Sequence, residues 1–292
     1  MKSERMQKVQ ELTAQLEEGI EKFVSSEEFL TYLKVMSKFH HYSFNNSILI
    51  ALQKPDATHI AGFSSWKTKF HRNVKKGEKG IKILSPYTYT MKEIDPETKE
   101  EIEHQKLGFK IAYVYDVSQT EGKELPTIGI KELTDDVDGF EKMLDMLIEV
   151  SEVPVTFEDI NSTAKGYYSR TTNSIVIQKD MPEAQTIKTL VHEMTHSKLH
   201  NEDILNKLKE EGIKLDRYTK EVEAESVAYV VCNHFGIDTA DYSFSYVAGW
   251  SKSLKLEELK CSLKKIQETA SFFIDAIEKK LENISLREAE CL

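Results

Sequence analysis

Two histidines and a glutamate in this chain stand at a spacing that can hold and use a metal ion. His192 and His196 lie four residues apart in a stretch that predicts one helix over residues 183–199, so their Cβ atoms lie roughly 5–6 Å apart on one face. Both imidazoles can then reach a single zinc ion at about 2.0–2.1 Å. Glu193 follows the first histidine, where its carboxylate can take a proton from a metal-activated water. This HExxH pattern predicts a Zn²⁺ site of the metallopeptidase type, with Glu193 as the catalytic base.

The third metal ligand is expected on the next helix, predicted over residues 219–235. A metzincin would need a third histidine at position 202, which is Glu202, and His200 lies too far along the helix, so we expect it on the surface. Glu221 and Glu225 share a helix face, as the glutamate-ligand (gluzincin) pattern requires. We expect Glu221 to bind the metal and Glu225 to accept a hydrogen bond from a ligand histidine, with the reverse assignment left open.

A peptidase also needs a donor for the oxyanion that forms during hydrolysis. Tyrosines near the predicted helices are the candidates, and the sequence does not separate them from tyrosines that only pack. They are Tyr167, Tyr168 and Tyr246.

Composition limits the class of protein. The chain has 292 residues, 40% of them hydrophobic and 30% charged, which is typical of a soluble globular protein large enough for two domains. Its 3 cysteines are widely spaced and form no CxxC pair, which argues against a disulfide framework or a cysteine zinc site. The sequence has no apolar signal segment and no membrane-spanning run. We therefore expect a cytoplasmic protein with no membrane partner.

Charge is distributed unevenly. The chain has a net charge of −10, yet residues 66–82 contain seven basic residues against the single acid Glu78. Aromatic residues are interleaved with these charges, and this combination is typical of surfaces that bind single-stranded nucleic acid without reading its sequence. The predicted DNA-binding residues are Trp66, Lys67, Lys69, Phe70, Arg72, Lys75, Lys76 and Lys79.

Hydrophobic periodicity divides the chain into two domains, 1–125 and 126–292. The first combines helices with strands, and the second a helix, a short strand and a hairpin with further helices. The fold class expected is α+β: a helical amino-terminal domain with a small antiparallel sheet, then a gluzincin-like domain whose small sheet packs on the HExxH helix. The predicted helices are 4–23, 25–39, 46–53, 136–150, 183–199, 219–235 and 256–281, and the main strands are 81–89, 109–117, 153–157 and a hairpin over 166–178.

Several motifs in order resemble a known family. Residues 42–50, 62–66, 74–81 and 114–120 resemble the amino-terminal domain of ArdC-type antirestriction proteins, and the segments around His192 and Glu221 resemble the zincin-like metallopeptidase domain of that family. The resemblance covers about residues 29–250. It implies single-stranded DNA binding by the first domain, a zinc site in the second, and a role in protecting incoming DNA of mobile elements from host restriction.

Two other functions fit the same residues. In one, the chain is an intracellular regulatory endopeptidase that cleaves a repressor or another protein, recruited by the first domain. In the other, it is a DNA-binding protein that keeps zinc for structure alone.

Overall fold

The computed structural model describes residues 2–22, 26–94, 101–125, 137–213, 215–237, 250 and 254–290, which form two compact units. The first unit comprises Met1–Lys22 and Asn45–Leu125, and the second comprises Phe23–Phe44 and Pro126–Leu292. Residues 23–44 therefore depart from the expected division at 125/126. They carry helix α2 (Ser26–Lys38), which packs on helix α8 (Arg217–His234) of the second unit and buries Phe29, Leu33 and Met36.

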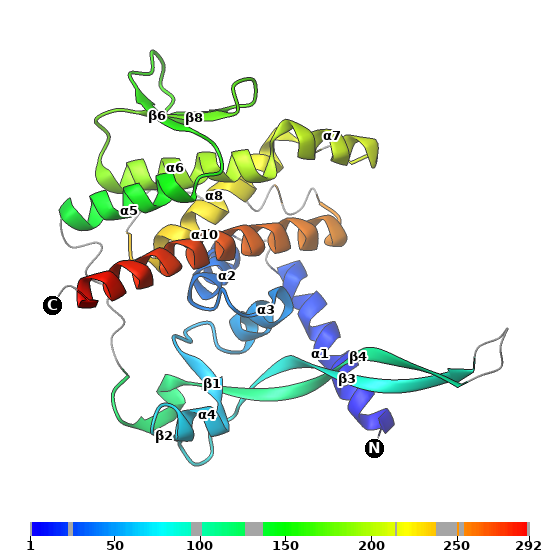
Figure 1. Ribbon diagram of the computed structural model, residues 1–292. Coiled ribbons are helices and arrows are strands. Elements are labelled where there is room, and N and C mark those ends of the chain that lie inside the picture. Colours follow the sequence, from blue (N-terminus) through cyan, green and yellow to red (C-terminus); the bar gives the residue numbers. More distant parts are fainter. Residues whose placement is uncertain are drawn as a thin grey trace. The chain divides into compact units, whose positions relative to one another are not determined.

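The first unit is built around a long antiparallel ribbon. Strands β3 (Ile81–Ile94) and β4 (Glu101–Asp116) pair along their whole length, with Ile81 opposite Val114, and β1 (Ile60–Gly62) adds to the other edge of β4. Figure 1 shows the ribbon extending away from β1, with α1 (Lys2–Lys22) packed across it. The remaining elements are α3 (Phe44–Gln53), α4 (Phe63–Thr68), β2 (Arg72–Val74), the 3₁₀ turn η1 (Val117–Gln119) and β5 (Thr120–Gly122), which pairs with β2.

Side-chain amides of α3 take the place of a neighbouring strand at the open edge of β3. Asn46 donates to the Leu84 carbonyl at 2.9 Å and accepts from the Leu84 N–H at 2.8 Å. Gln53, two turns further along α3, makes the same pair of bonds with Lys82, both at 2.9 Å. Because these bonds satisfy alternate backbone groups of β3, they both hold α3 on the sheet and block the edge against another strand.

The second unit places helices around α8. This helix packs against α2, against α6 (Glu183–Leu199) and against the long α10 (Leu256–Glu290), the orange-to-red helix of Figure 1. Val227, Ala228, Val230 and Val231 of α8 are fully buried. Helices α5 (Val137–Val150) and α7 (Glu202–Glu210) complete the described helices of this unit.

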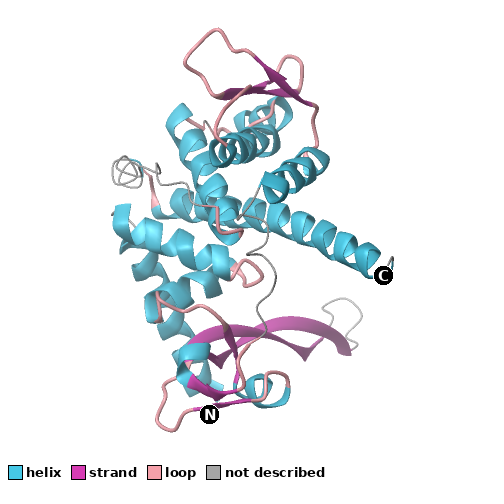
Figure 2. Ribbon diagram, turned by 90° about the vertical axis from the view of Figure 1, so that its left-hand side faces the viewer, coloured by secondary structure: helices cyan, strands magenta, loops and turns pink. Residues whose placement is uncertain are grey.

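A small mixed sheet lies on one side of these helices (Figure 2). Its strands are β6 (Val155–Glu158), β7 (Gly166–Ser169) and β8 (Ser174–Gln178) in the order β6-β8-β7, with β7 antiparallel and β6 parallel to β8. A Cβ on Gly166 would lie 2.7 Å from the Thr189 side chain. Glycine is therefore required for β7 to approach α6 this closely, one turn before the HExxH residues.

The predicted fold class is confirmed: the molecule is α+β, with a small sheet packed on the HExxH helix. The predicted helix over 183–199 matches α6, and the hairpin over 166–178 matches β7 and β8. The final helix continues to Glu290, beyond the predicted end at 281. None of the helices within the described residues is long and apolar enough to cross a membrane.

Candidate metal centre

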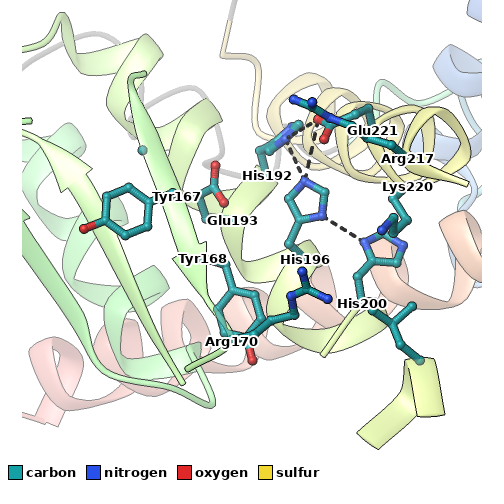
Figure 3. Close-up of a pocket in the computed structure, with 12 residues that line it drawn as sticks. Tyr167, Tyr168, Arg170, His192, Glu193, His196, His200, Arg217, Lys220 and Glu221 are labelled. Carbon is teal, nitrogen blue, oxygen red and sulfur yellow. Dashed lines mark hydrogen bonds and ion pairs between the residues drawn. The ribbon is translucent and has the colours of Figure 1, made fainter. Parts of the chain in front are cut away.

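Three donor atoms converge between α6 and α8. The Nε2 atoms of His192 and His196 lie 3.1 Å apart, and the Glu221 carboxylate lies 3.5 Å from the first and 3.8 Å from the second. Bonds of about 2.0–2.1 Å to a tetrahedral ion place two ligand atoms roughly 3.4 Å apart. The three side chains therefore already have the separation that one zinc-sized ion needs, and Figure 3 shows them pointing toward one another.

The far ring nitrogen of His192 is also engaged. Its Nδ1 lies 3.2 Å from Glu225, whose other carboxylate oxygen pairs with Lys188 at 2.8 Å. Because Nδ1–H donates to a carboxylate, the lone pair of the neutral ring is on Nε2, facing Glu221. Glu221 thus lies on the Nε2 side of His192, near both histidine Nε2 atoms, and Glu225 lies on the Nδ1 side.

His196 is oriented by a buried chain of hydrogen bonds. Its Nδ1 lies 2.9 Å from His200 Nδ1, and His200 Nε2 lies 2.8 Å from Glu223, which also accepts a hydrogen bond from Ser262 of α10. If His196 Nδ1–H donates to His200, then His200 carries its proton on Nε2 and donates to Glu223. Each hydrogen bond from His196 to Glu223 then joins one donor to one acceptor, and the lone pair of the His196 ring is left on Nε2.

The expectation that His200 is a surface residue was wrong. Its side chain is 3% exposed and Glu223 is fully buried. Burial lowers the pKa of His200 and outweighs the opposing effect of Glu223, which agrees with a neutral ring in the chain. The repeat of histidine at 192, 196 and 200 was the signal in the sequence, because residues four apart are neighbours on a helix.

The centre has the electrostatics of a cation site. Burial alone lowers the pKa of His192, but hydrogen bonds with Glu221 and Glu225 outweigh it and raise the pKa to about 9. The pKa of Glu221 is held well below its usual range, first by its hydrogen bonds with His192 and His196. Both shifts favour a proton on His192, with Glu221 as its counter-charge.

Glu193 lines the same pocket as His192, His196 and Glu221. The residue is 7% exposed and burial raises the pKa of its carboxyl, although the two histidines and the Tyr168 backbone N–H act in the opposite direction. A carboxylate whose pKa lies nearer to neutrality is a better proton acceptor in this chemistry. Figure 3 shows Glu193 between the histidines and strand β7.

A pocket opens on the histidines and Glu193. Of the tyrosines expected as oxyanion donors, Tyr167 points its ring away from His192 and His196 in Figure 3, and the Tyr168 hydroxyl donates to Asn173 at 2.8 Å. Tyr246 lies outside the described residues. Sequence reasoning missed three cations that line the pocket, which are Arg170, Arg217 and Lys220.

The predicted DNA-binding residues of the first unit have different environments. Trp66 is 1% exposed and its indole N–H donates to the Tyr115 carbonyl at 2.8 Å, so the ring belongs to the core and offers no face to a base. Arg72 donates to the Thr120 hydroxyl and to three backbone carbonyls, and Lys75 donates to the Ser118 carbonyl. The predicted residues with exposed side chains are Lys67, Lys69, Phe70, Lys75, Lys76 and Lys79.

The β3–β4 ribbon presents aromatic rings that sequence reasoning missed. Tyr87 and Tyr89 are 40% and 41% exposed on one face with rings 5.9 Å apart, and the register places Lys106 opposite Tyr89. Phe109 and Tyr113 are about half exposed on the opposite face. Successive side chains of a strand point to opposite faces, so the positions of these rings along the two strands were the signal available in the sequence.

Family models match both halves of the chain. Residues 2–117 match the model of the N-terminal domain of anti-restriction factor ArdC, and residues 111–270 match the model described as "Putative metallopeptidase family (DUF6782)". A crystal structure of the metal-free antirestriction protein ArdC from plasmid R388 aligns with a TM-score of 0.51 at 20% identity, covering 82% of this chain and 86% of that one.

A curated relative is an uncharacterised Bacillus anthracis protein, pXO2-81, which is 30% identical over 91% of this chain. The chain spans about half the length of this relative, because the alignment covers 50% of it. The chain therefore belongs to the family described as "Putative metallopeptidase family (DUF6782)" and has an ArdC-type architecture, with the amino-terminal ArdC domain preceding the domain of that family.

Proposed function

We propose that the second unit is a zinc peptidase in which His192, His196 and Glu221 hold the ion. The observation that carries this is the convergence of their three donor atoms, 3.1–3.8 Å apart, beside the buried Glu193. Two histidines and a glutamate are the ligand set of catalytic zinc sites that keep one coordination position open. When bound, the ion supplies a Lewis acid that polarises a carbonyl and acidifies water.

The protein's own groups then move the proton and position the substrate. The Glu193 carboxylate accepts the proton of the attacking water and delivers it to the departing amine. The pocket's cations, Arg170, Arg217 and Lys220, attract the negative charge of the oxyanion or of acidic substrate side chains. Tyr168 can add a hydroxyl donor if it exchanges its bond to Asn173 for one to the substrate.

Replacing Glu193 by Gln separates catalysis from metal binding. We expect the variant to bind zinc as the wild type does and to lose peptidase activity by about 10²–10⁴-fold, because only the base is removed. Activity is measured on casein and on a randomised peptide library, before and after chelation. Glu210→Gln, an exposed carboxylate on α7, is the matched control. Undiminished cleavage by the Glu193 variant would refute the proposal.

We further propose that the first unit binds single-stranded DNA. The match to the ArdC amino-terminal domain, five exposed lysines between residues 67 and 79, and the exposed rings of the β3–β4 ribbon support this. Cations follow the phosphates and flat rings stack on bases, which gives binding without sequence readout. Tyr87, Tyr89 and Phe70 take the stacking role first expected of Trp66.

Salt titration tests the lysines and the rings separately. Each phosphate contact contributes about 0.7 to the slope of log K against log salt for single strands, so Lys75, Lys76 and Lys79 changed together to Glu should lower the slope by about 2. Tyr87→Ala with Tyr89→Ala should weaken binding at constant slope, by about 1–3 kcal/mol per stacked base. Fluorescence anisotropy with an oligonucleotide measures both. Lys207, Lys209 and Lys264 changed to Glu form the control, and an equal loss there would refute the assigned surface.

With both activities, the protein would act as an antirestriction protein of a mobile element in the cytoplasm, protecting incoming single strands. Transfer of unmodified DNA into a restricting host measures this. The Glu193→Gln variant separates the alternatives: a regulatory endopeptidase requires Glu193 but not the DNA-binding lysines, whereas a protein with purely structural zinc is unaffected by Glu193→Gln and destabilised by His192→Ala.

A further inference from the structure

A second cluster of potential metal ligands lies in the same unit, away from the pocket. His40 and His41 follow α2, and Asp275 and Glu278 lie one turn apart on α10. We propose that these four residues form a structural site for a divalent ion of the zinc type, which ties the turn after α2 to α10. The site is separate from the first. His234, which contacts Glu278, is the last residue of α8, and Glu221 lies 13 residues before it, a distance of about 20 Å along the helix.

The separations of the donor atoms fit one tetrahedral ion. His40 Nε2 lies 3.3 Å from Asp275 Oδ1 and 3.7 Å from Glu278 Oε2, and His41 Nδ1 lies 3.6 Å from Asp275 Oδ1. These values bracket the separation of roughly 3.4 Å that two ligands adopt around zinc. One ligand atom from each of the four residues lies within 4.8 Å of all the others.

The burial of the His40 ring provides a second observation. Its side chain is only 3% exposed, yet neither ring nitrogen makes a hydrogen bond within the described part of the chain. Burying a polar ring without a well-formed hydrogen bond is costly, and such a group in a native protein calls for an explanation. Its Nε2 points at the two carboxylates, so a metal ion at this position would satisfy it.

The surroundings hold the ligands in place. Ser271 donates to the His40 carbonyl at 3.0 Å and Gln267 donates to the Tyr42 carbonyl at 2.7 Å, so α10 already fixes the backbone of the turn. His234 Nε2 lies 3.0 Å from Glu278 Oε1, the carboxylate oxygen that does not face His40, while His234 Nδ1 donates to the Ser37 carbonyl at 2.7 Å. A ligand carboxylate held in this way is typical of metal sites.

Ligand chemistry favours zinc. Two imidazoles and two carboxylates suit a borderline ion with four ligands, and a closed set of protein ligands is typical of a structural site. The turn immediately precedes Phe44, where the chain leaves the second unit. The bound ion would therefore stabilise the packing of residues 23–44 within this unit.

The test uses the full chain, stripped of metal and titrated with Zn²⁺ against a chromophoric chelator. We expect two tightly bound equivalents in the wild type and one in His192→Ala. The double variant His41→Ala with Asp275→Asn should also retain one, and all three changes together none. His41 and Asp275 are 69% and 56% exposed, so these variants are expected to fold, whereas His40→Ala could fail for other reasons.

Glu268→Gln, another exposed carboxylate on α10, is the control and should keep both equivalents. In the His192→Ala background, Zn²⁺ should raise the melting temperature, and the rise should disappear with His41→Ala and Asp275→Asn. A second equivalent that survives those two changes, or a wild type whose single equivalent is lost with His192→Ala, would overturn the proposal. A failure of the peptidase site would instead remove the equivalent that depends on His192.

Discussion

The roles of Glu221 and Glu225 can be separated by their effect on zinc affinity. Glu225 reaches His192 Nδ1 at 3.2 Å, on the ring edge away from the site, whereas Glu221 lies within 3.8 Å of both Nε2 atoms. Glu225→Gln keeps an acceptor for Nδ1–H but loses its charge, so we expect zinc affinity to fall by about 10–100-fold. That is about 1.4–2.7 kcal/mol, in line with one hydrogen bond to a charged group.

Glu221→Gln removes a ligand and should weaken zinc binding by more than 100-fold. Competition with a chromophoric chelator at pH 7.5 gives both constants, in a background with His41→Ala and Asp275→Asn so that only the first site is measured. Glu210→Gln, far from any ligand in sequence and exposed, should leave the affinity unchanged. The reasoning is refuted if Glu225→Gln weakens binding as much as Glu221→Gln, since that would give Glu225 the place of the ligand.

Three further changes test the supporting structure. Asp116→Asn should lower the stability of the first unit by about 2–3 kcal/mol in urea unfolding, because this buried carboxylate accepts bonds from Thr58 N–H, His59 N–H and Ser118. These bonds hold the pKa of Asp116 below its usual value despite burial, so the stabilisation is complete above the unfolded pKa and is lost as pH falls below about 4, where variant and wild type should converge. His200→Ala should weaken zinc binding about 10–100-fold and also destabilise the protein, because buried Glu223 loses a donor. Leu190→Ala, at a fully buried position on α6, should cost about 2–5 kcal/mol by denaturation with little change in zinc affinity.

Local patterns were sufficient to predict which side chains come together between α6 and α8. The spacing of His192 and His196 places them on one face as soon as the segment is helical. Glu221 could be predicted because it shares a face of the next helix with Glu225, and that face can pack against the two histidines. These relations lie within single helices or between two neighbouring ones. The structure places all three donor atoms within 3.8 Å of one another, as that logic requires.

Relations between distant segments could not be read in the same way. His200 looked exposed because its burial depends on Glu223 and on Ser262, which comes 62 positions later on another helix. Trp66 looked like a base-stacking residue because lysines flank it, yet its indole is bonded to Tyr115, 49 residues away. The membership of residues 23–44 in the second unit also depends on long-range packing, with α8.

The unequal burial of the three proposed ligands leads to a prediction about substrate preference. His192 and His196 are 18% and 16% exposed and each is fixed at its far nitrogen, while Glu221 is 44% exposed. Glu221 is therefore the most exposed of the three, and the pocket's Arg217 and Lys220 lie about one turn or less before it on α8. A substrate that approaches from this side meets positive charge before it meets Glu193. Peptides with acidic residues near the cleaved bond should consequently be preferred, and adding salt or replacing Arg217 by Ala should reduce that preference.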